Sequence, residues 1–110
     1  MNYLERYGIW KRKVTDKTLL EELEQMDENQ IEDAFYRDLA FGTGGLRGIL
    51  GAGSNRMNIY VVAKASQGLS DYLKETEKEP RVAIGYDTRI NSELFAETAA
   101  EVFAANGISV

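Results

Sequence analysis

The sequence predicts an α/β fold in which N-terminal helices precede a strand–helix–strand unit. Three observations support this prediction. Apolar residues recur at helical spacing through the first forty residues. A short apolar run at 82–86 is followed by a helical pattern and then by the apolar run 108–110, which is the order of a βαβ crossover. Between these two parts, six glycines fall within residues 42–53 and indicate a loop.

Length and composition predict one globular domain. The chain has 110 residues, of which 44% are hydrophobic and 28% charged. Its net charge of -5 argues against nucleic acid or an anionic membrane surface as the partner. No apolar run has the length of a transmembrane span, and the N-terminus lacks a signal-peptide pattern. We therefore expect a cytoplasmic location, with no nucleic-acid and no membrane partner.

The chain contains neither cysteine nor histidine. Disulfides and thiolate metal sites are thereby excluded, and there is no reason to expect zinc. Ser-His and Cys-His nucleophile pairs are excluded as well.

The segment 1–40 is predicted to be a helical N-terminal extension with three helices. Either Thr15 or Asp16 is expected to cap the second helix, and Asn29 with Glu32 is expected to form a capping box for the third. The aromatic residues of these helices are expected to pack rather than to bind a cofactor. The apolar positions at helical spacing are Tyr3, Leu4, Tyr7, Trp10, Leu19, Leu20, Leu23, Met26, Ile31, Ala34, Phe35 and Leu39.

The second part of the chain is predicted to alternate strands and helices. A short strand is expected at 49–50, a helix over 59–73 with Asn58 as its N-cap, and a buried strand at 82–86. A further helix, capped by Asn91 or Ser92, is expected to stop at 106–107 before a strand at 108–110. A three-residue strand is a poor place for a domain to end, so we expect a fragment of a longer protein.

The glycine-rich loop is the first candidate for chemistry. Such a segment can expose successive backbone N–H groups, and Arg47 within it offers a fork suited to a phosphate or a carboxylate. The alternative is a tight connector with a solvated arginine. The loop lacks the Gly-Lys-Ser/Thr of a Walker motif and the G-x-G-x-x-G of a dinucleotide motif, which leaves a generic anion site. Its residues are Phe41-Gly42-Thr43-Gly44-Gly45-Leu46-Arg47-Gly48.

Two further clusters contain arginine. Residues 85–89 follow the predicted strand, so they are expected at its carboxyl end, where α/β sheets bind ligands. There Asp87 either holds a metal, acts as a base or closes a turn, and Arg89 either holds a phosphate or pairs with a carboxylate of this chain. In residues 54–58, Arg56 either joins a cationic wall or is an ordinary loop arginine.

Taken together, the segments 41–48, 55–58 and 85–89 resemble the first domain of the α-D-phosphohexomutases, a superfamily that contains phosphoglucomutase, phosphomannomutase and phosphopentomutase. The lead-in 35–39 and the glycine at Gly44 resemble the phosphoglucomutase-2/phosphopentomutase branch. The resemblance implies a three-layer α/β/α core around a mixed sheet, of which residues 41–110 would be the first part.

The resemblance also implies an activity. A phosphorylated serine, with Mg²⁺ beside it, would interconvert sugar 1-phosphate and sugar 6-phosphate, with glucose as the expected sugar, through a sugar 1,6-bisphosphate intermediate. Arg47 and Arg89 match motif arginines near the phosphoserine and sugar phosphate. Thr43, Gly44 and Gly45 complete the expected phosphate-binding set.

This chain lacks the family's serine loop, so none of its serines is expected to be the nucleophile and no metal ligand is expected in it. We expect the remaining domains of the same enzyme to supply both, and the isolated chain to be inactive. The alternatives are a standalone phosphate-binding or sugar-phosphate-binding module and a helical interaction module. The residues before Val110 do not discriminate among glucose, mannose and pentose phosphates.

Overall fold

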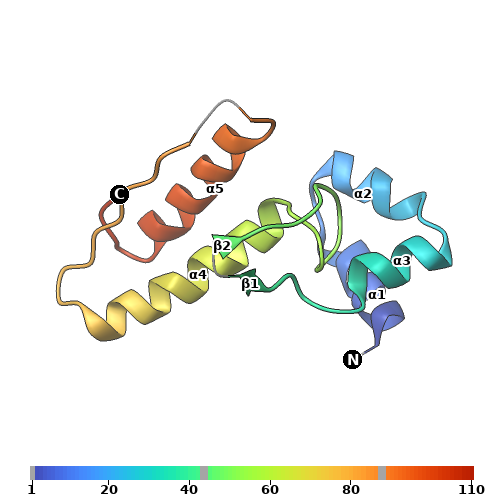
Figure 1. Ribbon diagram of the computed structural model, residues 1–110, viewed down its shortest axis with the longest axis horizontal. Coiled ribbons are helices and arrows are strands. Elements are labelled where there is room, and N and C mark those ends of the chain that lie inside the picture. The colour runs from blue at the N-terminus through green and yellow to red at the C-terminus, as the bar shows by residue number, and fades with distance from the viewer. Residues whose placement is uncertain (1, 43–44, 87–88) are drawn as a thin grey trace. The chain divides into compact units, whose positions relative to one another are not determined.

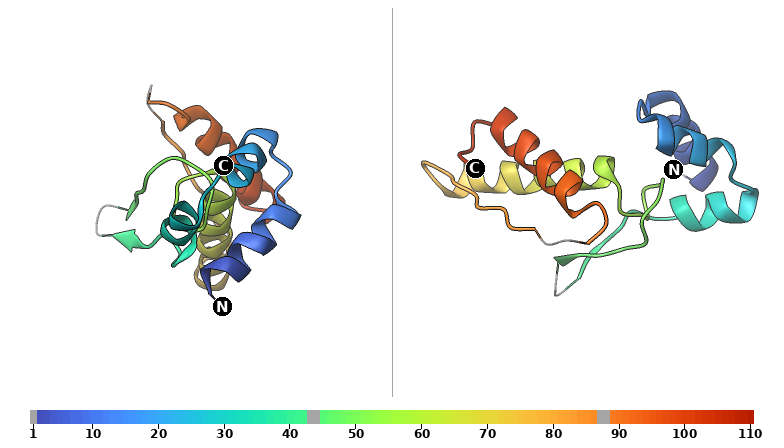
Figure 2. Two further views of the ribbon diagram at one scale, coloured as in Figure 1. Left: turned by 90° about the vertical axis from the view of Figure 1, so that its right-hand side faces the viewer. Right: turned by 90° about the horizontal axis from the view of Figure 1, so that it is seen from above.

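The computed structural model describes residues 2–42, 45–86 and 89–110 (Figures 1 and 2). The chain divides into two compact units, Met1–Asn58 and Ile59–Val110, which are described separately. The elements in chain order are α1 (Tyr3–Lys13), α2 (Lys17–Glu24), α3 (Glu28–Phe35), β1 (Phe41–Gly42), β2 (Gly45–Leu46), α4 (Ile59–Thr76) and α5 (Ser92–Ala105).

In the first unit α1 packs against both α2 and α3, and the side chain of Phe35 on α3 is fully buried. Tyr7 and Trp10, one turn apart on α1, meet the Phe35 ring edge to face, with ring centroids 5.8 and 5.5 Å away. The Tyr7 hydroxyl donates to the carbonyl oxygen of Leu23 at 2.7 Å, which ties α1 to α2. The aromatic residues of α1 are therefore packing groups, as predicted.

The helix caps of this unit follow the sequence in one case and not in the other. Asp16 caps α2, because its carboxylate accepts from the backbone N–H of Leu19 at 2.9 Å. The prediction of a capping box from Asn29 and Glu32 was wrong. Asp27 caps α3 instead, and the side chain of Gln30 accepts from the Asp27 N–H at 2.9 Å. The same spacing two residues earlier is already a complete box, so the helix begins at Glu28.

The Tyr3 hydroxyl has a shifted pKa. Desolvation, assisted by the carboxylates of Glu28 and Glu32, raises the pKa of the Tyr3 hydroxyl above its usual value. That hydroxyl donates to Glu28 Oε1 at 3.3 Å, which joins the start of α1 to the start of α3.

In the second unit, α4 packs against α5 (Figure 1). Small buried residues allow the close approach. The fully buried hydroxyl of Ser70 is satisfied within α4 by the Ser66 carbonyl oxygen at 2.8 Å. The predicted stop at 106–107 is confirmed, since Asn106 is the C-cap of α5 and Gly107 has a φ of 75°. The Asn106 side chain also bonds Gln67 of α4, at 2.9 and 3.1 Å.

The other predicted caps of this unit have a mixed outcome. Asn58 lies directly before α4, and its side-chain amide donates to the carbonyl oxygens of Gly51 and Gly53. Asn91 is the N-cap of α5, but its backbone is left-handed with a φ of 67° and its side chain makes no capping bond. The cap position was predicted correctly, and its chemistry was not.

The predicted three-layer α/β/α architecture with a mixed sheet was wrong. In the part of the chain that the structure describes, the only ladder is the antiparallel pair of β1 and β2, two residues each. No residue of the predicted strand at 82–86 lies in a strand or bridge: the parallel bridge beside it joins the preceding Arg81 to Ser109, and residues 82–86 are at most half-buried. The predicted strand at 49–50 is one parallel bridge, Leu50 to Met57.

The physical reason is the lack of partners. A strand exists only where neighbouring backbone receives its N–H and C=O groups, and an apolar run does not supply that neighbour itself. Here the backbone of Val82 finds the Ser109 carbonyl oxygen at 2.8 Å, and the parallel direction is the one predicted for 81 and 109. Pairing does not extend beyond that bridge, so both apolar runs remain extended chain.

None of the helices in the described ranges is long and apolar enough to cross a membrane.

Candidate functional site

The glycine-rich loop contains the short hairpin of β1 and β2 (Figure 1). Phe41 pairs with Leu46 and Gly42 with Gly45. Two predicted site residues, Thr43 and Gly44, lie outside the described residues. Gly45 begins β2, and Arg47 directly follows that strand.

Arg47 is exposed, and no described residue forms a hydrogen bond or an ion pair with its guanidinium. Its donors therefore face solvent. A guanidinium in this state presents a planar fork that matches two oxygens of a phosphate or a carboxylate. The same arrangement is that of a solvated arginine in a connecting loop. The geometry therefore leaves Arg47 available to an anion and is compatible with both roles that the sequence left open.

Packing explains two glycines of this segment without an anion, and it requires glycine at position 53. A Cβ on Gly53 would lie 2.6 Å from the backbone oxygen of Ala34, and the φ of Gly53 is 131°. A Cβ on Gly48 would lie 2.7 Å from the side chain of Leu39. The sequence analysis assigned Gly48 and Gly53 to the same loop as the glycines around Arg47. Spacing alone does not distinguish a glycine that binds a ligand from one that packs against another part of the chain.

The two arms of the loop are joined at a base that we call the loop stem, residues 37–39 and 53–55. The backbone N–H of Leu39 donates to the Ser54 carbonyl oxygen at 2.8 Å, and the Ser54 hydroxyl donates to the Arg37 carbonyl oxygen at 2.8 Å. The buried amide of Asn55 completes the stem by donating to the Asp33 carbonyl oxygen at 3.1 Å. The stem therefore holds the ends of the hairpin segment against α3.

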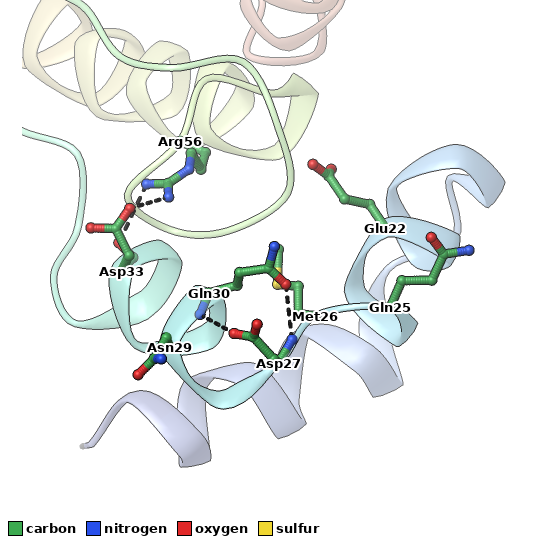
Figure 3. A pocket seen from close by; sticks show the side chains of 8 residues that line it. All are labelled: Glu22, Gln25, Met26, Asp27, Asn29, Gln30, Asp33 and Arg56. Atoms are coloured by element: carbon green, nitrogen blue, oxygen red, sulfur yellow. Dashed lines mark hydrogen bonds and ion pairs between the residues drawn. The ribbon is translucent and has the colours of Figure 1, made fainter.

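Arg56 is a structural arginine. Its guanidinium forms an ion pair with the Asp33 carboxylate (Figure 3). It also donates to the carbonyl oxygens of Asp33, at 3.3 Å, and Asn55, at 3.0 Å. Only 15% of its side chain is exposed. Of the two roles that the sequence left open, the loop arginine is the one observed.

The second cluster is arranged differently from its prediction. Asp87 lies outside the described residues, and Gly85 and Tyr86 are exposed in extended chain rather than at the carboxyl end of a strand. Arg89 is exposed, and its carbonyl oxygen accepts from the backbone N–H of Ser92 at 3.1 Å, next to the start of α5. Arg89 belongs to the second unit and Arg47 to the first, so each is described within its own unit.

A polar pocket of about 490 Å³ lies in the first unit, between α2, α3 and the segment around Arg56 (Figure 3). Its charged groups already have partners within the chain. The Asp27 carboxylate accepts from the Gln30 N–H at 2.8 Å, and the Glu22 carboxylate accepts from the Ala52 N–H at 2.7 Å. The pocket is lined by Glu22, Gln25, Met26, Asp27, Asn29, Gln30, Asp33 and Arg56.

The carboxylates do not gather into a metal site. Among the described residues there is no group of three or more acidic, histidine or cysteine side chains that could hold an ion. The described residues thus do not fit Mg²⁺.

Comparison with known proteins gives a consistent result. Residues 38–110 match the family described as "Phosphoglucomutase/phosphomannomutase, alpha/beta/alpha domain I". The chain is 39% identical over 79 residues to a phosphoglucomutase of Staphylococcus haemolyticus, which covers 72% of this chain and 14% of that protein. It is 33% identical over 102 residues to phosphoglucomutases of Staphylococcus saprophyticus and Staphylococcus aureus, which covers 93% of this chain and 18% of each relative.

The 102-residue matches include most of the helical segment that precedes residue 38. The chain spans less than a fifth of the length of these curated relatives. No solved structure matches it. Because the family match covers well over half of the chain and includes both Arg47 and Arg89, the chain belongs to the phosphoglucomutase/phosphomannomutase family, as its N-terminal domain segment.

Proposed function

We propose that this chain contributes part of the active site of a phosphohexomutase, an isomerase that interconverts a sugar 1-phosphate and a sugar 6-phosphate. The observation that carries the proposal is Arg47. It lies within the matched family segment, directly after a glycine-rich hairpin, with its guanidinium exposed. The staphylococcal relatives are named phosphoglucomutases, which favours glucose as the sugar.

In the proposed site Arg47 binds the phosphate of the sugar substrate. Phosphoryl transfer places charge on the oxygens of the transferred group, and a fixed guanidinium stabilises that charge and aligns the phosphate. Thr43, Gly44 and Gly45 stay the predicted phosphate-binding set of the loop, and Arg89 is proposed as a second phosphate-binding arginine. The role of the chain is to bind and orient the substrate.

The remaining parts of the proposal come from the family resemblance. On this resemblance we propose a phosphoserine, a bisphosphate intermediate, Mg²⁺ and a cytoplasmic location for the whole enzyme. The partners are the sugar phosphate and other domains of the same enzyme. The division into a helical extension at 1–40 and a mutase domain from residue 41 stays a prediction, as does the phosphoglucomutase-2/phosphopentomutase branch.

Calorimetric titration of the 110-residue chain with glucose 6-phosphate tests the proposal. We expect saturable binding in roughly the millimolar range, since one phosphate clamp supplies only a few charge-assisted hydrogen bonds. Arg47→Ala should lower the affinity about tenfold or more, and Arg47→Lys should fall between, because lysine keeps the charge and loses the bidentate fork.

The matched control is Arg12→Ala, which removes the same charge from exposed α1. Equal affinity in Arg47→Ala and the parent chain would contradict the proposal. In the same samples we expect no conversion of glucose 1-phosphate to glucose 6-phosphate, because these residues lack the family's serine loop. Turnover by the chain alone would show that the nucleophile had been assigned to the wrong place.

A further inference from the structure

We propose that Glu22 of α2 is a positioning residue that fixes the arm of the glycine-rich loop carrying Arg47. The inference rests on the proposed function, in which Arg47 binds the substrate phosphate. Glu22 lies outside the segment matched to the family domain, so the domain's own pattern does not include it. It is thirty residues away from the backbone group that it binds.

Both carboxylate oxygens of Glu22 lie against the loop, one at Ala52 and the other at Gly51. Oε2 accepts from the backbone N–H of Ala52 at 2.7 Å, and Ala52 is fully buried. Oε1 faces Gly51, where a Cβ would lie only 2.9 Å away. Gly51 has a φ of 150°, so both its backbone conformation and the adjacent carboxylate favour glycine there.

The same arm has further contacts between Arg47 and Ala52. Gly48 lies against the side chain of Leu39, and the Ile49 carbonyl oxygen accepts from the Met57 N–H at 2.8 Å. The Gly51 carbonyl oxygen accepts from the side-chain amide of Asn58 at 2.8 Å. These partners lie close by in the loop and its stem. Glu22 adds an attachment to a helix of the first unit.

Removal of the carboxylate has a direct consequence. The buried Ala52 N–H would lose its acceptor, and a buried donor without a partner is costly. The arm would then sample other conformations, so binding a phosphate at Arg47 would also require ordering the arm. Affinity for the phosphate falls without loss of any group that touches it.

Amide hydrogen exchange of the 110-residue chain, followed by NMR, tests this inference. In Glu22→Ala we expect exchange at Ala52 to accelerate about tenfold or more, the factor corresponding to a hydrogen bond with a charged acceptor. Glu22→Gln should give a smaller rise, because its amide oxygen still accepts. The matched control is Glu21→Ala, which removes the same charge from a neighbouring exposed position of α2. The affinity for glucose 6-phosphate should fall most in Glu22→Ala, less in Glu22→Gln and not in Glu21→Ala.

The amide of Ile31, bonded to the Asp27 carbonyl oxygen, serves as a reference amide of the first unit outside the arm. If exchange at Ile31 also rises in Glu22→Ala, that variant has lost stability throughout the unit. Exchange at Ala52 is then compared between the parent chain and Glu22→Gln. Unchanged protection at Ala52, or an equal effect of Glu21→Ala, would overturn the inference, as would faster exchange with unchanged affinity. A parent chain that binds no glucose 6-phosphate contradicts the proposed function alone, because exchange at Ala52 still reports whether Glu22 fixes the arm.

Discussion

At the scale of single residues, the arginines show how much the sequence leaves open. Arg47 and Arg56 are both loop arginines in or near the glycine-rich segment, yet of the two only Arg56 is bound by other described residues. Its partner Asp33 lies 23 residues earlier, so nothing local in the sequence identifies the pair. The sequence predicted which residues are candidates, and tertiary contacts decide which candidates remain available to a ligand.

Glycines at the loop give a residue-scale prediction. Gly53→Ala should destabilise the chain by about 2–4 kcal/mol, because the new Cβ meets the Ala34 backbone and the φ is unfavourable. Gly8→Ala is the matched control, since Gly8 lies inside α1 and a Cβ there would come no closer than 3.9 Å, to the side chain of Arg12. That change should stabilise by about 0.5–1 kcal/mol. Urea unfolding measures both free energies, and a Gly53→Ala chain as stable as its parent would contradict the packing described here.

At the scale of elements, helices were predictable and strands were not. A helix satisfies its own backbone, so periodicity and a cap go far to place it, and all five described helices overlap the segments that apolar spacing predicted, although α2 ends before Met26 and α3 before Leu39. A strand depends on a partner elsewhere in the chain. The run at 82–86 has strand-like composition, yet the bridge beside it joins the preceding residue, Arg81, to Ser109. The hairpin within the glycine-rich loop was missed because its two-residue strands contain glycine at half of their positions.

The caps of α3 give an element-scale prediction. Asp27→Ala should lower the free energy of unfolding by about 1 kcal/mol, because the Gln30 N–H loses its acceptor. Asn29→Ala, at the position that the sequence had suggested for the cap, should change it by less than about 0.5 kcal/mol, since Asn29 is exposed within the helix. Thermal unfolding of the two variants distinguishes them. A larger cost for Asn29→Ala would place the start of α3 later than residue 28.

At the scale of the whole molecule, charge restricts how an anion can bind. The chain carries a net charge of -5, so its overall field repels a sugar phosphate. Binding must therefore depend on a local cation, and in the first unit Arg47 is exposed while Arg56 is engaged with Asp33. The pocket between α2 and α3 has a size suited to a small ligand, but its carboxylates oppose a phosphate and already bond within the chain.

Residue-resolved NMR titration of the 110-residue chain with glucose 6-phosphate tests this account most directly. We expect saturable shifts of the backbone amides of residues 45–48 that disappear in Arg47→Ala, while the amides lining the pocket at 25–33 stay unchanged. Shifts centred on 25–33, or shifts at 45–48 that persist in Arg47→Ala, would contradict the assignment of phosphate binding to the glycine-rich loop.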